Sequence, residues 1–186
     1  MYREGDRGDS IFINGGGVVI SYSEMASGKR RVAGFRLYAD VFGLAEHGRY
    51  INTARAVTSV TVYRIPTETL ARILRQDAEL EFHFLCKAVD ELRRAQRKSI
   101  IVARRDAAGR VAMFIDMLRH TPGIAATGDS IAIPVSRKDI ADYLNLTLES
   151  VSRACRQLGD AGILAFRKRR VRVLDRGRFD LMVGNE

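Results

Sequence analysis

The sequence predicts an α+β protein in three parts: a β-rich domain over residues 1–78, a long helix over 79–105, and a helical domain ending in a β-hairpin over 106–186. Three observations support this prediction. Short apolar runs alternate with glycine turns in the first part, and a long helical stretch without Gly or Pro forms the second. Two short amphipathic helices joined by a tight turn stand in the third.

Composition narrows the class of protein and of partner. The chain is 46% hydrophobic and 28% charged, which is ordinary for a globular protein, and its net charge of +9 favours anionic partners such as nucleic acid or an anionic membrane. No apolar run approaches the roughly 20 residues of a membrane span, and the charged start MYREGDRGDS is unlike a secretory signal. Two widely separated cysteines, Cys86 and Cys155, give no disulfide framework and suit a reducing cytoplasm.

The first part is expected to form a small roll or barrel of short strands. Strands are predicted at residues 11–13, 18–20, 31–35, 53–57 and 60–65, followed by a short helix over 67–75. The glycine-rich segment 14–17 lacks the Lys-Ser/Thr pair and the following helix of a phosphate-binding loop, so a plain hairpin turn is predicted there.

The long helix carries an apolar stripe with alternating steps of three and four, the pattern of a two-stranded coiled coil. The stripe consists of Leu85, Ala88, Leu92, Ala95, Ser99 and Val102. A second copy of the chain is therefore expected to pair along it, although the same stripe is also compatible with packing on the roll of its own chain. A homodimer is the favoured interpretation.

The two short helices over residues 135–158 have the pattern of a helix-turn-helix. Ser136 with Asp139 forms a capping box that starts the first helix, and Thr147 can cap the second. On the second helix a polar face of Glu149, Ser152, Arg153 and Arg156 lies opposite the apolar residues Val151, Ala154 and Leu158. This face is either an ordinary solvated surface or one that enters the DNA major groove, where Arg can bind guanine and a carboxylate can bind cytosine.

The segments around these two helices complete a winged helix-turn-helix. A helix over residues 106–120 and a strand around Ile131 precede them, and a hairpin with its tip at 167–169 follows. The cationic residues of this last region are Arg167, Lys168, Arg169, Arg170, Arg172, Arg176 and Arg178. Such a tip is expected to lie along DNA phosphates and to add affinity without sequence preference.

The residues 136–144 and 146–153 resemble the DNA-binding signature of the Crp/Fnr family of bacterial transcription regulators. The E-x-x-S-R spacing is similar to the Fnr/FixK branch, and Leu148 stands where the cyclic-AMP branch carries arginine. The resemblance implies that Glu149, Ser152 and Arg153 read the bases of an inverted repeat with TTGA-like half-sites. It also implies that the bound homodimer recruits RNA polymerase, usually for activation.

Phosphate contacts are predicted near the helix ends and at the hairpin tip. The residues concerned are Ser136, Arg137, Thr147, Ser150, Lys168 and Arg169. Cys155, at the flank of the apolar face, is expected to be buried as a small apolar residue, with a redox switch as the alternative.

The segment Gly5–Asp9 and the TARAV run at 53–57 resemble the effector roll of the same family. The family usually carries another strand-bearing segment upstream, so either the chain is truncated, or its start codon is misassigned, or the roll is incomplete, and an unpaired strand edge would be the physical consequence. Family members that bind cyclic nucleotides place Glu and an Arg-Ser pair where this chain has Leu44 and Tyr50-Ile51, which argues against cyclic AMP because apolar groups cannot satisfy a phosphate. The cysteine cluster that holds the iron–sulfur centre of Fnr is absent as well.

No other cofactor or metal is predicted, because His47, His83 and His120 lack metal-ligand spacing. The preferred prediction is a cytoplasmic, homodimeric, DNA-binding transcription regulator that acts as an activator and binds double-stranded DNA. The alternatives are a small-molecule-binding β-roll sensor that acts through protein partners and an enzyme on a cupin-like scaffold. The missing metal ligands count against the enzyme.

Overall fold

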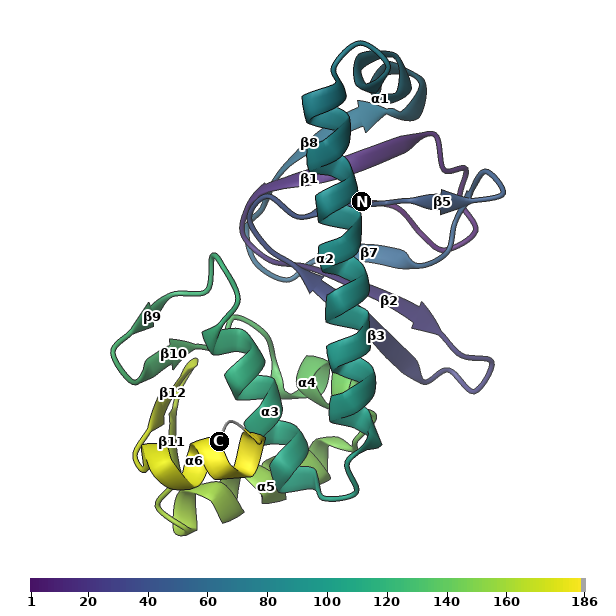
Figure 1. Ribbon diagram of the computed structural model, residues 1–186. Coiled ribbons are helices and arrows are strands. Elements are labelled where there is room, and N and C mark those ends of the chain that lie inside the picture. Colours follow the sequence, from purple (N-terminus) through teal and green to yellow (C-terminus); the bar gives the residue numbers. More distant parts are fainter. Residues whose placement is uncertain (185–186) are drawn as a thin grey trace. The chain divides into compact units, whose positions relative to one another are not determined.

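The structure, a computed structural model that describes residues 1–184, divides into two compact units, Met1–Arg97 and residues 98 onward (Figure 1). The first unit contains β1 (Ser10–Gly16), β2 (Val19–Glu24), β3 (Arg30–Arg36), β4 (Val41–Phe42), β5 (Ala45–Glu46), β6 (Arg49–Tyr50), β7 (Thr53–Ala56), β8 (Thr61–Pro66), α1 (Thr67–Leu74) and most of α2 (Ala78–Ala103). The second contains the end of α2, α3 (Ala107–Arg119), β9 (Ala126–Thr127), β10 (Ser130–Ala132), α4 (Arg137–Leu144), α5 (Leu148–Asp160), β11 (Leu164–Arg167), β12 (Arg170–Val173) and α6 (Arg176–Val183). The predicted α+β class is confirmed, with a β-rich first domain, a long helix and a C-terminal helix-turn-helix.

Two antiparallel three-stranded sheets build the first unit. Their strand orders are β4-β1-β8 and β3-β2-β7. In the first sheet Ile11 lies opposite Ile65, and in the second Ile20 lies opposite Phe35. Both sheets contribute side chains to one core cluster, since Phe12 comes from the first sheet and Val19 from the second. The short apolar runs therefore form the two sides of a roll, as their alternating pattern predicts.

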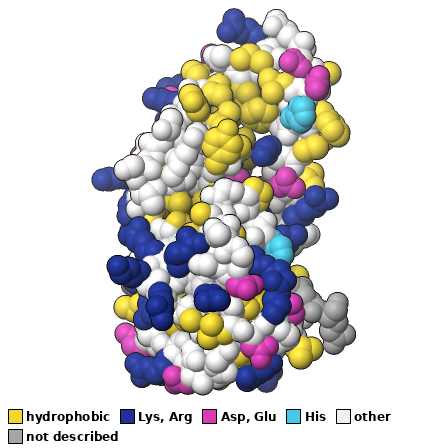
Figure 2. All heavy atoms as spheres, turned by 90° about the vertical axis from the view of Figure 1, so that its left-hand side faces the viewer, with side chains coloured by type: hydrophobic (Ala, Val, Ile, Leu, Met, Phe, Trp, Pro, Cys, Tyr) yellow, Lys and Arg dark blue, Asp and Glu magenta, His cyan; other side chains and the backbone are white. Residues whose placement is uncertain are grey.

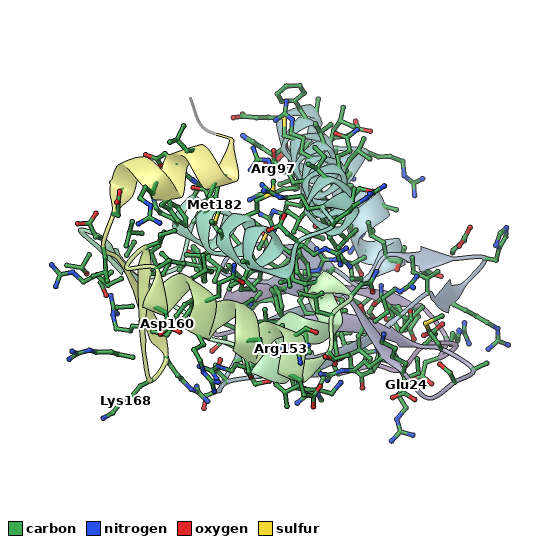
Figure 3. The ribbon with its side chains drawn as sticks, turned by 90° about the horizontal axis from the view of Figure 1, so that it is seen from below. Glu24, Arg97, Arg153, Asp160, Lys168 and Met182 are labelled. Carbon is green, nitrogen blue, oxygen red and sulfur yellow. The ribbon has the colours of Figure 1, made fainter. Side chains whose placement is uncertain are left out.

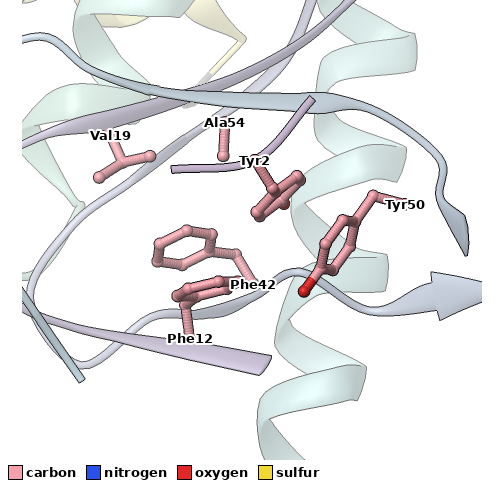
Figure 4. Close-up of a cluster of buried hydrophobic side chains, with 6 residues drawn as sticks. All are labelled: Tyr2, Phe12, Val19, Phe42, Tyr50 and Ala54. Carbon is pink, nitrogen blue, oxygen red and sulfur yellow. The ribbon is translucent and has the colours of Figure 1, made fainter. Parts of the chain in front are cut away.

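Four aromatic side chains fill this core: Tyr2, Phe12, Phe42 and Tyr50 (Figure 4). The rings of Tyr2 and Tyr50 stack with centroids 3.9 Å apart, and those of Phe12 and Phe42 stack at 5.4 Å. The hydroxyl of Tyr50 donates a hydrogen bond to the carbonyl oxygen of Ser10 at 2.7 Å. Burial raises the pKa of Tyr2 to about 12, so its phenol stays neutral inside the roll.

The glycine-rich segment 14–17 does not form the predicted hairpin. Strand β1 pairs with β4 and β8, whereas β2 pairs with β3 and β7, so the segment carries the chain from one sheet to the other. The buried side-chain amide of Asn14 donates to the carbonyl oxygens of Gly17 at 3.1 Å and Arg36 at 2.9 Å. Gly17 has a φ of +80°, which permits the change of direction. The prediction was wrong because the partners of β1 lie far away in sequence and β2 pairs within the other sheet.

Two ion pairs hold α2 on the roll. Arg36 of β3 pairs with Glu91, and Arg94 pairs with Asp40 at 2.7 Å. The roll partners are almost fully buried, because the side chains of Arg36 and Asp40 are 9% and 7% exposed. A further hydrogen bond, from the backbone N–H of Leu37 to the Asp40 carboxylate at 2.8 Å, fixes the acidic partner. The pairs define which face of α2 meets the roll.

Another face of α2 stays exposed and apolar. Its members are Phe82 (63% exposed), Leu85 (60%), Val89 (39%), Leu92 (59%) and Ile100 (61%). Leu85 and Leu92 belong to the stripe that the sequence predicts as a dimer seam, and its members Ala88 and Ala95 are exposed as well.

Among residues 1–184 no helix, α2 included, has the length and apolar composition that would let it cross a membrane.

The second unit is built around α3. Its residues Phe114 and Ile115 are fully buried, and the helix contacts both α5 and α6. A small sheet of order β11-β12-β10-β9 closes the unit, with Ile131 opposite Val171. Phe114, Ile115 and Ile131 occupy apolar positions that the sequence pattern assigns to the inside of the C-terminal domain.

Helix α6 is absent from the predicted elements. It begins after Asp175, whose carboxylate accepts from the backbone N–H of Arg178 at 2.9 Å, and ends at Gly184 in the left-handed conformation. Only one residue within its bounds, Phe179, is buried. Its apolar residues Phe179, Leu181, Met182 and Val183 are spread around the helix and do not share one face, so the pattern gives no amphipathic signal for this helix.

Candidate nucleic-acid interface

The first helix of the helix-turn-helix, α4, begins with the predicted capping box. The Ser136 hydroxyl oxygen accepts from the backbone N–H of Asp139 at 3.1 Å, and the Asp139 carboxylate accepts from the backbone N–H of Ser136 at 3.2 Å. Together they satisfy two N–H groups that a helix start leaves without partners. The capping box therefore fixes where α4 begins and where its neighbour Arg137 emerges.

We expect Ser136→Ala to lower the free energy of unfolding by about 1 kcal/mol, the usual worth of a side-chain N-cap. Urea unfolding followed by circular dichroism measures the change. Ser136→Thr keeps a capping hydroxyl and serves as the matched control. Equal stability of wild type and the alanine variant would contradict the role of the cap.

A tight turn links α4 to α5. Asn145 closes α4 in the left-handed conformation at φ 55°, and the backbone N–H of Leu146 donates to the carbonyl oxygen of Ala141 at 2.9 Å. Thr147 then caps α5, because its hydroxyl oxygen accepts from the backbone N–H of Ser150 at 3.1 Å. Asn tolerates this backbone conformation better than most residues, so the turn follows directly from the sequence.

Helix α5 separates a buried face from an exposed one, as its periodicity predicts. Val151, Ala154, Cys155 and Leu158 are buried. The polar side carries the exposed residues Glu149, Arg153 and Arg156 together with the half-buried Ser152. Figure 3 shows Arg153 and Asp160 on α5 and Lys168 at the tip of the β11–β12 hairpin. The three predicted base-reading residues thus share one accessible surface.

The charges on this surface are set by local contacts. The pKa of Glu149 is lowered by hydrogen bonds from its own backbone N–H and from the Thr147 hydroxyl. The nearby positive charges of Arg153 and Lys138 lower it further. The carboxylate is therefore ionised at neutral pH and can accept a hydrogen bond. One terminal nitrogen of Arg153 donates to the Ser150 hydroxyl oxygen at 3.2 Å, which orients the guanidinium. The Glu149 carboxylate, an acceptor, and the Arg153 guanidinium, a donor, therefore lie about one helical turn apart on α5.

The N-terminal turn of α4 adds two cations beside α5. Arg137 is exposed, and Lys138 pairs with the buried Asp142 at 2.5 Å. Asp142 is buried, although a charged residue is not expected on the inner face of an amphipathic helix. An Asp four residues after a Lys was the available signal for this pair.

The hairpin β11–β12 brings the predicted cationic tip together. Arg167, Lys168 and Arg169 are exposed, and Lys168 takes the left-handed conformation at φ 50°. Arg170 is held differently, because its guanidinium donates to the hydroxyl of Ser130 at 2.8 Å and to the Ser130 carbonyl at 3.1 Å. Figure 2 shows Lys and Arg side chains gathered over the lower part of the view, where the second unit lies.

Cys155 is buried, as the preferred interpretation expects, with 6% of its surface exposed. Burial raises the pKa of its thiol, while the charge of Arg137 acts in the opposite direction. A protonated, buried thiol reacts slowly with oxidants.

Sequence reasoning missed the residues that act across elements. Arg110 of α3 donates to the carbonyl oxygen of Leu144 at the end of α4 at 3.0 Å, and Arg104 donates to that of Met182 in α6 at 2.6 Å. No local pattern signals bonds between residues so far apart in the chain.

Comparisons with family models, with known proteins and with solved structures all point to the same family. Residues 109–180 match the model of the Crp-like helix-turn-helix domain, and residues 1–77 match that of the cyclic nucleotide-binding domain. The transcriptional activatory protein AadR of Rhodopseudomonas palustris is 31% identical over 98% of this chain and 77% of its own length. The nitrogen fixation regulation protein FixK of Bradyrhizobium diazoefficiens is 31% identical over 89% of this chain and 70% of its own. The solved structure of FixK2 from Bradyrhizobium japonicum superimposes with a TM-score of 0.86 at 32% identity, covering 98% of this chain and 91% of that one.

Proposed function

The chain belongs to the Crp/Fnr family of DNA-binding transcription regulators, on its Fnr/FixK branch, and we propose that it binds an inverted repeat with TTGA-like half-sites as a homodimer. One observation carries the proposal. An ionised Glu149 and an oriented Arg153 stand on the exposed face of a capped helix, with Ser152 between them. These groups match the hydrogen-bonding edges of cytosine and guanine in the major groove.

Gel-shift titration against a library of TTGA-N-TCAA palindromes with varied spacer tests this function. We expect one spacer length to bind far more tightly than DNA of unrelated sequence. Absence of binding at low salt would instead point to a β-roll sensor that acts through proteins. Membership of a family of transcription regulators already sets the chain apart from enzymes.

Dimerisation is proposed along the exposed apolar stripe of α2. Leu85 and Leu92 are each about 60% exposed, and apolar side chains of this size are seldom left in water in rows. The ion pairs to the roll occupy another face of the helix, so the stripe is available to a second copy. Two recognition helices about one DNA turn (~34 Å) apart would then read a palindromic site.

The proposed phosphate contacts lie around the base-reading face. Ser136 and Arg137 start α4, Thr147 and Ser150 start α5, and Lys168 and Arg169 form the hairpin tip. The Thr147 hydroxyl already accepts from the backbone N–H of Ser150, and the Ser150 hydroxyl accepts from Arg153, so both hydroxyls would share their bonds with a phosphate. The two hairpin cations are exposed and offer fully charged donors.

Lys168→Ala with Arg169→Ala is expected to weaken binding to all sequences alike. Removal of one phosphate interaction reduces the slope of log K against log salt by about 0.9, so the double variant of a dimer should reduce it by about 3–4. Titrations at several salt concentrations measure the slope. Arg72→Ala removes an exposed cation from α1 and is the control. A change in base preference without a change in slope would contradict the assignment.

We further propose that the roll takes no cyclic nucleotide. The positions that would face the ligand hold Leu44 and Ile51, which are apolar, and Tyr50, whose ring is buried in the aromatic core. None of the three provides the cationic donor that a phosphate needs. Iron–sulfur chemistry is not proposed either, since such clusters take four ligands, usually cysteines, and the 186 residues contain only Cys86 and Cys155.

Addition of cyclic AMP is therefore expected to leave the DNA affinity unchanged. Isothermal titration of the protein with cyclic AMP should likewise give no binding heat. A rise in DNA affinity of tenfold or more, about 1.4 kcal/mol, would contradict the proposal.

Activation of transcription is proposed from the resemblance and from the relatives that are described as activators. In this scheme the DNA-bound dimer contacts RNA polymerase in the bacterial cytoplasm. Transcription from a promoter with the selected palindrome, in the presence and absence of the protein, distinguishes activation from repression.

A further inference from the structure

The last turns of α2 belong to the second unit and pack within it. Ile101 is only 2% exposed. The Lys98 ammonium lies 4.8 Å from the ring centroid of Tyr143 in α4, a cation–π contact. The Tyr143 hydroxyl reaches the sulfur of Met117 in α3 at 3.3 Å. The end of α2 is thus attached to the helix-turn-helix by side chains as well as through the backbone.

Residues 104–106 connect α2 to α3 and are held by Arg104. Its guanidinium donates to the carbonyl oxygen of Met182, near the end of α6, at 2.6 Å and to the Asp106 carboxylate at 3.1 Å. Asp106 in turn caps α3 by accepting from the backbone N–H of Gly109. The connector is therefore tied to the ends of two helices of the second unit.

Arg110 ties the same connector to the turn of the helix-turn-helix. Its Nε donates to the carbonyl oxygen of Arg104 at 2.6 Å, and its Nη1 donates to the carbonyl oxygen of Leu144 at 3.0 Å. Leu144 is the last residue of α4, where carbonyl groups have no partner inside the helix. A planar guanidinium can serve both acceptors at once, which the point charge of a lysine does less well.

Gly109 makes room for this arrangement. A Cβ atom added there would meet the Asp106 carboxylate first, and would lie 2.6 Å from Nε of Arg104 and 2.7 Å from its Cζ. Any side chain at this position would therefore displace the Asp106 carboxylate, the Arg104 guanidinium or both. Glycine is needed here inside α3 because the side chains of Asp106 and Arg104 pack against its Cα, and not because the backbone turns.

We propose that Arg104 and Arg110 form a latch that fixes the orientation of the helix-turn-helix on the end of α2, and so sets the half-site spacing that the dimer accepts. The inference rests on the proposed function. A three-residue connector alone leaves rotational freedom, whereas the bond from Arg104 to Met182 and the bond from Arg110 to the Arg104 carbonyl oxygen remove it. Two DNA-binding domains that are each fixed on their α2 can engage only one spacing, while freely hinged ones tolerate several.

The test compares Arg104→Gln, Arg110→Gln and Arg110→Lys with wild type. Each protein is titrated with the best palindrome, with the same palindrome lengthened or shortened by one base pair, and with a single half-site. Wild type should prefer its best spacing strongly. The glutamine variants should lose about tenfold of that preference while their half-site affinity stays within about twofold, because the recognition surface is untouched. Arg110→Lys keeps the charge and should lose part of the preference.

Arg105→Gln removes an exposed arginine from the same connector and is the matched control, with an unchanged preference expected. Limited trypsin digestion gives a readout without DNA. Cleavage after Arg105 should be faster in Arg110→Gln than in wild type, because the connector opens more often.

The outcomes separate the latch from the proposed function. Wild-type spacing preference in the glutamine variants, or unchanged cleavage after Arg105 in Arg110→Gln, overturns the latch. Equal losses for palindrome and half-site with preference intact also overturn it, since the arginines would then only stabilise the domain. Failure of the proposed function appears in wild type itself, as no half-site binding, and the trypsin result still decides the latch.

Discussion

Arg153→Ala is expected to abolish base discrimination at one position of each half-site, at a cost of about 1–3 kcal/mol per half-site and roughly 2–6 kcal/mol for the palindrome. The reason is geometric. The Arg153 guanidinium is exposed on α5 and is oriented by the Ser150 hydroxyl, so it can donate two parallel hydrogen bonds to one guanine. Titration of every single-base variant of the half-site measures the loss.

The control for this prediction lies one turn further along the same helix. Arg156→Ala removes the same charge from an exposed position and should leave the base preferences unchanged. Arg153→Lys keeps the charge without the fork and should also lose discrimination. If Arg153→Ala weakened all sequences equally, Arg153 would be a phosphate contact and its base-reading role would be wrong.

Leu85→Glu combined with Leu92→Glu should convert the protein to a monomer. The two leucines are 60% and 59% exposed on the free stripe of α2, and in a dimer the new carboxylates would face one another in an apolar seam. Palindrome affinity should fall by about 10²–10⁴, the usual gain from joining two binding modules, while half-site affinity stays the same. Sedimentation velocity gives the oligomeric state and gel shift gives the affinity.

His83→Glu is the matched control for the seam. His83 is exposed on α2 and is not a member of the stripe, so the substitution adds one carboxylate to the same helix without altering the proposed contact. A double leucine variant that remains dimeric would place the dimer interface elsewhere on the chain.

Local patterns predicted most of the recognition unit correctly. The capping box of Ser136 and Asp139, the cap at Thr147 and the amphipathic face of α5 depend on residues within a few positions of one another. Sequence spacing determines such features because a helix brings residues three and four apart onto one side. The elements and the surface could therefore be predicted from the sequence alone.

Features that depend on distant partners could not be predicted in this way. The side-chain amide of Asn14 bonds the carbonyl of Arg36, which the local glycine pattern does not reveal. The Arg110 bond to Leu144 spans 34 positions. Helix α6 forms because Phe179 finds a place in a core built by other helices. These features depend on contacts between residues that are distant in the sequence, and such contacts cannot be identified from the local pattern of one sequence.

The ion pairs between the roll and α2 have a consequence for how this lineage can change. Arg36 and Asp40 are buried, so loss of Glu91 or Arg94 alone would leave a buried charge without its partner. This would destabilise the fold far more than the loss of both members of a pair. Substitutions at these four positions should therefore occur in pairs during evolution, and replacement of a whole pair by well-packed apolar residues should have little effect on stability.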